Sequence, residues 1–144
     1  MRQALRALLI ATSLTGLMAA SVQANAGGVA AVPLNNGQET TDAKYGGSGS
    51  FTWWVDGSSI CYTLTVRNLT ATPVAAHIHG VAERQVAAGV VVPLIAPSGP
   101  TATSSNCAAV EAGLLSAIVA DPGSYYVNVH TPMFPGGEVR GQLK

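Results

Sequence analysis

Two segments decide how this chain is interpreted: Ala76-His77-Ile78-His79-Gly80 and, fifty residues further on, Tyr126-Val127-Asn128-Val129-His130-Thr131. Both alternate in the manner of β-strands, whose successive side chains point to opposite faces. In the first segment the two histidines share one face and the isoleucine lies on the other. In the second, two valines lie opposite the asparagine and the histidine. If the aliphatic side chains face a core, all three histidines of the protein lie on the polar side of a sheet.

Three convergent imidazoles are a typical ligand set for a transition metal. We therefore predict a surface metal site formed by His77, His79 and His130. Nitrogen sites generally bind Cu(II) more tightly than Zn(II), so copper is the first expectation and zinc the second. The alternative is that the imidazoles only hydrogen-bond to the backbone and hold loops in place.

The rest of the chain has the pattern of an antiparallel sandwich or barrel, in which turn residues separate short strand-like runs. Asp56-Gly57 is a strong hairpin signal between two such runs. Residues 96–105, rich in Pro, Ser, Thr and Gly, predict an exposed loop, and residues 114–119 predict one short helix. The strand-like runs are residues 29–34, 48–55, 60–67, 74–79, 90–92, 125–131 and 138–143.

Residues 1–26 have the features of a cleaved secretory signal peptide: a basic start, an apolar run and the small-x-small site Ala24-Asn25-Ala26. The remaining residues 27–144 form one domain without a second apolar run of spanning length, so we predict an exported protein, periplasmic or secreted, with no membrane insertion after cleavage. Its net charge near −2 gives no basic surface for nucleic acid or an anionic membrane.

Cys61 and Cys107 are the only cysteines, and an oxidising compartment predicts that they form one structural disulfide. Such a bond would close a loop of about 47 residues and stabilise the fold by up to ~4 kcal/mol. Two free thiols or thiolate metal ligands are the alternatives.

The last two predicted strands supply further candidates around the metal. One hairpin register pairs His130 with Glu138 and Asn128 with Arg140, within reach across neighbouring strands. Glu138 would then orient His130 as a second-shell carboxylate, with Arg140 and Asn128 beside it. The alternative is a Glu138–Arg140 surface ion pair. Met133 could be a soft axial copper ligand, or it could pack the loop against the sandwich.

Four blocks of the chain resemble the signature of the CHRD domain, the module first described in chordin: residues 34–39, 76–80, 126–131 and 134–143. The resemblance spans about residues 34–143. It implies an extracellular or exported immunoglobulin-like β-sandwich, of a family whose members are modules of larger secreted proteins or stand alone in bacteria and mostly lack a defined activity. A metal ion is the expected partner, and an extracytoplasmic protein is a further candidate.

A more distant similarity is to copper-zinc superoxide dismutase, which also has a His-x-His strand, a later strand histidine and an arginine beside the metal. It implies a superoxide-dismutase-like sandwich, with the three histidines as copper ligands and Arg140 at the arginine position. No fourth histidine and no zinc-ligand cluster is present. We therefore expect a non-enzymatic module that holds or transfers copper. The alternatives are a structural or protein-interaction module without metal and a copper oxidoreductase acting on superoxide.

Overall fold

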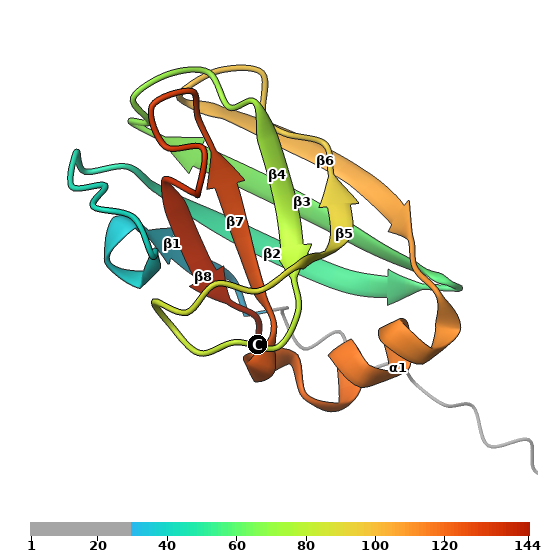
Figure 1. Cartoon of the computed structure of the whole chain (residues 1–144). Helices are drawn as coiled ribbons and strands as arrows, with labels where there is room; N and C mark the ends of the chain where they lie inside the picture. The colour runs from blue at the N-terminus through green and yellow to red at the C-terminus, as the bar shows by residue number, and fades with distance from the viewer. Residues whose placement is uncertain (1–29) are drawn as a thin grey trace, which may run out of the picture.

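Antiparallel strands and one short helix make up the computed structural model, which describes residues 30–144 (Figure 1). The predicted all-β fold is thereby confirmed. In chain order the elements are β1 (Val32–Asn35), η1 (Asn36–Gln38), β2 (Ser48–Asp56), β3 (Ser59–Arg67), β4 (Ala75–His79), β5 (Val90–Leu94), β6 (Ala102–Ala109), α1 (Ala112–Ala120), η2 (Pro122–Ser124), β7 (Tyr126–His130) and β8 (Val139–Gln142).

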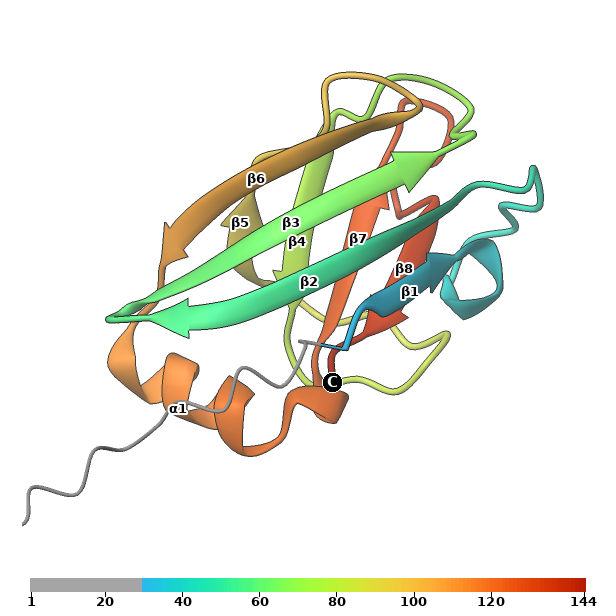
Figure 2. The same cartoon turned by 180° about the vertical axis from the view of Figure 1, so that it is seen from behind.

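The strands follow the order β5-β4-β7-β8-β1-β2-β3-β6 and fold into two layers. Figures 1 and 2 show β4, β5, β7 and β8 on one side and β2, β3 and β6 crossing behind them. The layers are joined where β1 meets β8, through the pairing of Asn35 with Arg140. Between them lies a core to which Ile78, Val127 and Val129 all contribute. The histidine-bearing face of β4 and β7 is consequently turned away from the core.

The β2–β3 hairpin forms at Asp56-Gly57, as the sequence predicts. Asp56 pairs with Ser59 across the turn. Gly57 has a φ of +57°, the left-handed conformation that tight hairpin turns require and that glycine adopts without a steric penalty. The alternating side chains of β3 that were expected on one face, Ile60, Tyr62, Leu64 and Val66, are all buried.

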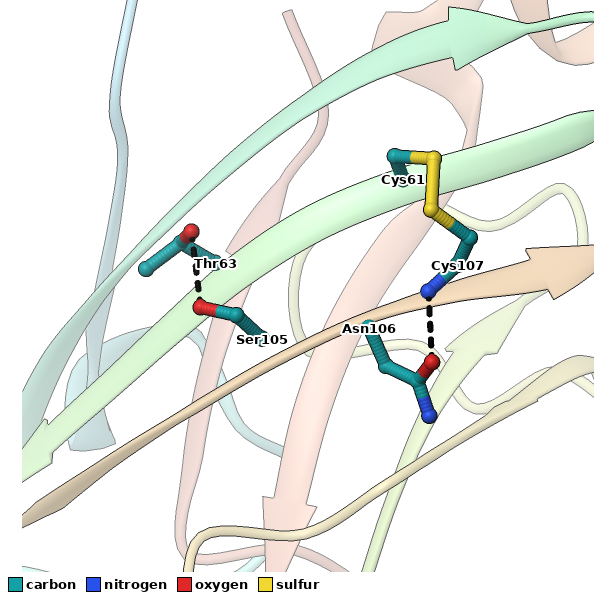
Figure 3. The surroundings of a disulfide bond; sticks show 5 residues. All are labelled: Cys61, Thr63, Ser105, Asn106 and Cys107. Carbon is teal, nitrogen blue, oxygen red and sulfur yellow. Dashed lines mark hydrogen bonds between the residues drawn. A yellow bond between two sulfur atoms is a disulfide. The ribbon is translucent and has the colours of Figure 1, made fainter.

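The prediction of a loop over residues 96–105 is wrong at its second half, because β6 begins at Ala102. This polar strand is an edge strand held to β3 by cross-strand pairs. Thr63 and Ser105 are hydrogen-bonded at 3.0 Å, and the predicted Cys61–Cys107 disulfide follows next along the same pair of strands (Figure 3). Composition alone suggested a loop; pairing with β3 made it a strand.

The predicted signal peptide, residues 1–26, lies outside the described residues. Within residues 30–144, no helix combines the length and apolar composition needed to cross a membrane.

Candidate metal centre

The three histidines converge, as the strand phases predict. His77 and His79 come from β4 and His130 from β7, and these two strands are antiparallel neighbours. Ala75 pairs with His130 and His79 with Tyr126, so the register places His77 between the other two rings. Each histidine offers one ring nitrogen such that the three atoms lie within 4.8 Å of one another. This group could hold one metal ion.

The expectation that the site lies on an open surface is wrong. His79 and His130 are only 7% and 8% exposed, and His77 is half-buried. The loop between β4 and β5 crosses the outer face of the β4–β7–β8 layer at the end where β4 finishes with His79 (Figure 1), and the β7–β8 loop holds His130 through the carbonyl oxygen of Pro135. The polar face of this layer is therefore a second, covered interior, and His77 is its most exposed ligand candidate.

Backbone carbonyls fix the tautomers of the two buried histidines. Nδ1 of His79 lies 2.8 Å from the carbonyl oxygen of Ala88, and Nδ1 of His130 lies 2.9 Å from that of Pro135. A carbonyl can only accept, so both Nδ1 atoms carry hydrogen and donate it. In each neutral ring Nε2 is then unprotonated and has a lone pair of the kind that binds a metal. This is the usual way in which a protein presents an imidazole ligand.

The Nε2 atoms of His79 and His130 carry the lone pairs that the cluster offers. Nε2 of His79 is buried and has no hydrogen-bond partner within residues 30–144. Nε2 of His130 lies 3.1 Å from Nδ1 of His77. Ligand nitrogens on a tetrahedral ion with bonds of about 2.0–2.1 Å are about 3.3 Å apart, so this pair is already near metal-bound spacing.

The surroundings also favour neutral imidazoles. Burial, with the neighbouring His130 and His79 adding to it, lowers the pKa of His77 below its usual range. Burial likewise lowers the pKa of His130, although its hydrogen bond to Pro135 opposes the shift. Neutral rings can bind a metal without first losing a proton, so both shifts favour metal binding near neutral pH.

Glu138 is hydrogen-bonded through its carboxylate to Thr70 and Thr131 and not to His130, so it does not orient the imidazole as predicted. Its buried carboxylate accepts hydrogen bonds from the backbone N–H of Thr70 at 2.8 Å and from the Thr70 and Thr131 hydroxyls at 2.7 and 2.6 Å. Glu138 precedes β8, whose first residue is Val139, and there the chain has left the strand alternation on which the prediction relied. Glu138 therefore ties the β3–β4 loop to the end of β7.

Arg140 pairs with Asn128, which confirms the predicted register, but its side chain is neither a surface ion-pair partner nor free to face a metal. It is fully buried, and its guanidinium donates to the carbonyl oxygens of Val86 and Glu83 at 2.7 and 2.6 Å. Its Cζ also lies 3.3 Å from the centroid of the Tyr126 ring. Arg140 thus holds the β4–β5 loop, and the position implied by the dismutase similarity is not supported.

The side chain of Asn128 lies beside Glu39, a residue that was not predicted from the sequence to be near the site. Asn128 is 2% exposed, and its side chain faces the carboxylate of Glu39, itself 4% exposed. Burial raises the pKa of Glu39 to about 7, against the opposing influences of Arg140 and Asn128. Glu39 is the last residue of the first CHRD-like block, residues 34–39. It lies outside the predicted strands, so strand alternation could not predict which way its side chain points.

Met133 lies in the turn between Thr131 and Phe134, and its side chain is 59% exposed. The turn precedes Pro135, whose carbonyl oxygen holds His130. Its role as an axial ligand stays a prediction.

The comparisons with known proteins agree with this geometry at the level of the family. The family model described as the CHRD domain matches residues 22–143, which is most of the chain. The chain belongs to the CHRD domain family. Neither curated proteins nor solved structures give a significant match.

Three blocks of the CHRD resemblance meet on one face of the domain. Residues 76–80 supply two histidines, 126–131 supply the third, and 134–143 supply Pro135 and Arg140, which hold the site from β8 and the loop before it. Membership of the CHRD family indicates a binding module, and the face where its blocks meet is the place to look for the ligand.

Proposed function

We propose that this CHRD-domain protein is an exported binding module that holds or transfers one copper ion through His77, His79 and His130. Zinc is the second candidate metal by the same ligand chemistry. Copper is favoured because an all-nitrogen site binds Cu(II) more tightly than other divalent first-row ions.

The proposal is carried by Nε2 of His79, which is buried and has no hydrogen-bond partner among residues 30–144. If the histidines only braced loops, the Nδ1 bonds to Ala88 and Pro135 would be sufficient, and burying a further unpaired nitrogen would cost about 1–3 kcal/mol without benefit. A metal ion coordinated by this lone pair would satisfy the nitrogen and remove that cost. Loop bracing is supported by the same two hydrogen bonds and remains the second candidate function.

The three imidazoles would contribute differently. His79 and His130 are held with Nε2 unprotonated, whereas the Nδ1 of His77 faces the lone pair of His130 and must itself carry hydrogen when no metal is bound. If His77 binds the metal through Nδ1, its hydrogen must first move from Nδ1 to Nε2. As the half-buried member of the group, it has access to solvent for that exchange.

Metal binding is tested by titrating the metal-free protein with Cu(II) and Zn(II) and by measuring metal content after export-competent expression. His77→Ala, His79→Ala and His130→Ala each remove one ligand. Thr103→Ala, an exposed position on the β6 edge, is the matched control. We expect one equivalent of copper in the wild type and the control and loss of stoichiometric binding in each histidine variant.

Thermal melts separate the two candidate functions. A ligand present at 100 times its Kd stabilises the native state by ~2.7 kcal/mol, so copper should raise the Tm of the wild type and the control only. If copper leaves all Tm values unchanged while His79→Ala and His130→Ala lower them, the histidines only brace loops and the metal proposal is rejected.

A further inference from the structure

Tyr126 forms the centre of a three-layer stack beside the metal ligands. Its ring is parallel to the His79 imidazole within 5°, with centroids 4.7 Å apart. The Arg140 guanidinium carbon lies 3.3 Å from the centroid of the same ring. Since β7 runs between β4 and β8, His79 approaches Tyr126 from one neighbouring strand and Arg140 from the other (Figure 1). A cation over an aromatic face is attractive, and more so in a desolvated position such as this.

The stack and the β4–β5 loop share their hydrogen bonds. The hydroxyl of Tyr126 accepts from the backbone N–H of Ala88 at 3.0 Å, and the carbonyl oxygen of Ala88 accepts from Nδ1 of His79 at 2.8 Å. Arg140 binds the same loop through Glu83 and Val86. One residue of the loop, Ala88, and one aromatic ring therefore define both the plane of the imidazole and its rotation within that plane.

We infer that Tyr126 and Arg140 are positioning residues that direct Nε2 of His79 toward the metal. The ring of Tyr126 sets the plane of the imidazole, Ala88 selects the tautomer, and Arg140 holds both the ring and the loop in place. Neither residue touches the ion. This inference rests on the proposed metal-binding function.

The signal for Tyr126 was present in the sequence. It shares the strand phase of Asn128 and His130, so it had to lie on the polar face. A buried tyrosine on such a face needs a partner for its hydroxyl. Only the path of the β4–β5 loop shows that the partner is the backbone N–H of Ala88, the residue whose carbonyl oxygen also holds His79.

Three variants test the inference: Tyr126→Leu removes the ring, Tyr126→Phe removes only the hydroxyl, and Arg140→Lys keeps the charge without the planar group. Tyr125→Phe, on a neighbouring tyrosine that packs into the core, is the matched control. The first readout is the tautomer of His79 in the metal-free protein, by long-range proton–nitrogen-15 correlation. The second is Cu(II) affinity by chelator competition, with the electron paramagnetic resonance spectrum of the loaded protein.

We expect Tyr126→Leu to weaken Cu(II) binding by about 10–100-fold, as for other residues that orient a ligand, and to populate both tautomers of His79. Tyr126→Phe should lose about fivefold, the effect of one neutral hydrogen bond, with an altered copper spectrum, and Arg140→Lys should fall between them. Tyr125→Phe should match the wild type in tautomer and affinity.

The inference is overturned if folded Tyr126→Leu keeps the Nδ1–H tautomer and wild-type affinity. Should that variant fail to fold, an unchanged spectrum and affinity in Tyr126→Phe overturns it equally. A wild type that binds no copper rejects the proposed function. In that case positioning toward a metal falls with it, while a tautomer change in the variants would still identify the stack as what orients His79.

Discussion

Nδ1 of His77 lies 3.1 Å from Nε2 of His130, although 53 residues separate them in the chain. The contact exists because β4 and β7 are antiparallel neighbours, and because the register puts the two rings on the same face one step apart. Each side chain is ordinary when considered alone. Together with His79 they form a nitrogen cluster that is covered by a loop and has one lone pair without a partner.

The contribution of His77 and His130 to the stability of the metal-free protein should fall as the pH falls from 7 to 5. The pKa values of His77 and His130 are lowered in the folded state, so the unfolded chain binds more protons below its reference value of about 6.5. Their contribution is complete above that value and is lost as the pH falls through the folded pKa values. Urea melts at pH 5, 6 and 7 measure this, with His77→Gln/His130→Gln as the control. A double variant with the wild-type slope would contradict the expectation.

Glu39 should change the pH dependence of stability in the opposite direction from the two histidines. Its pKa of about 7 in the folded state exceeds the ordinary value of 4.5, so the folded state keeps the proton to a higher pH than the unfolded chain does. Stability therefore falls as the pH rises between the two values. Glu39→Gln keeps the shape and cannot ionise. Relative to the wild type, it should gain up to about 3 kcal/mol in unfolding free energy between pH 4.5 and pH 8. Chemical denaturation at both pH values provides the measurement, and a constant difference would show that Glu39 titrates normally.

Glu138→Gln should lower stability without affecting the metal. The variant replaces a carboxylate that accepts three hydrogen bonds from Thr70 and Thr131, so we expect a loss of about 1–3 kcal/mol. Copper affinity should stay near the wild-type value, rather than fall the 10–100-fold typical of a residue that orients a ligand. Melts and chelator competition on the same preparation separate these effects. A large loss of affinity would restore the second-shell role that the sequence suggested.

Gly137→Ala should be strongly destabilising. Gly137 has a φ of +125°, and an added Cβ would lie 2.6 Å from both carboxylate oxygens of Glu39 and 2.7 Å from Nδ2 of Asn128. Backbone strain and overpacking each cost about 1–3 kcal/mol. Gly89→Ala, where an added Cβ meets nothing within 4 Å, is the control and should change stability by about 0.5 kcal/mol or less. Equal effects of the two substitutions would mean that Glu39 and Asn128 do not pack against Gly137.

The local alternation of the strands was enough to predict much of the site. It placed Ile78, Val127 and Val129 in the core and the three histidines opposite, and the Asn128–Arg140 register followed from extending two strands toward each other. The disulfide required only the number of cysteines and an oxidising compartment. These features depend on side-chain periodicity and composition, which can be read from the sequence alone.

The tertiary structure decided the role of segments whose side chains show no regular strand alternation. Glu138 turned toward Thr70 because it lies just outside β8, and the Ser/Thr-rich segment became β6 because β3 offered it an edge. The β4–β5 loop supplies the hydrogen-bond partners of His79 and Tyr126, and the β7–β8 loop supplies that of His130. The path of a loop is set by contacts with residues distant in sequence, such as those of Arg140 with Glu83 and Val86, and no local pattern encodes them.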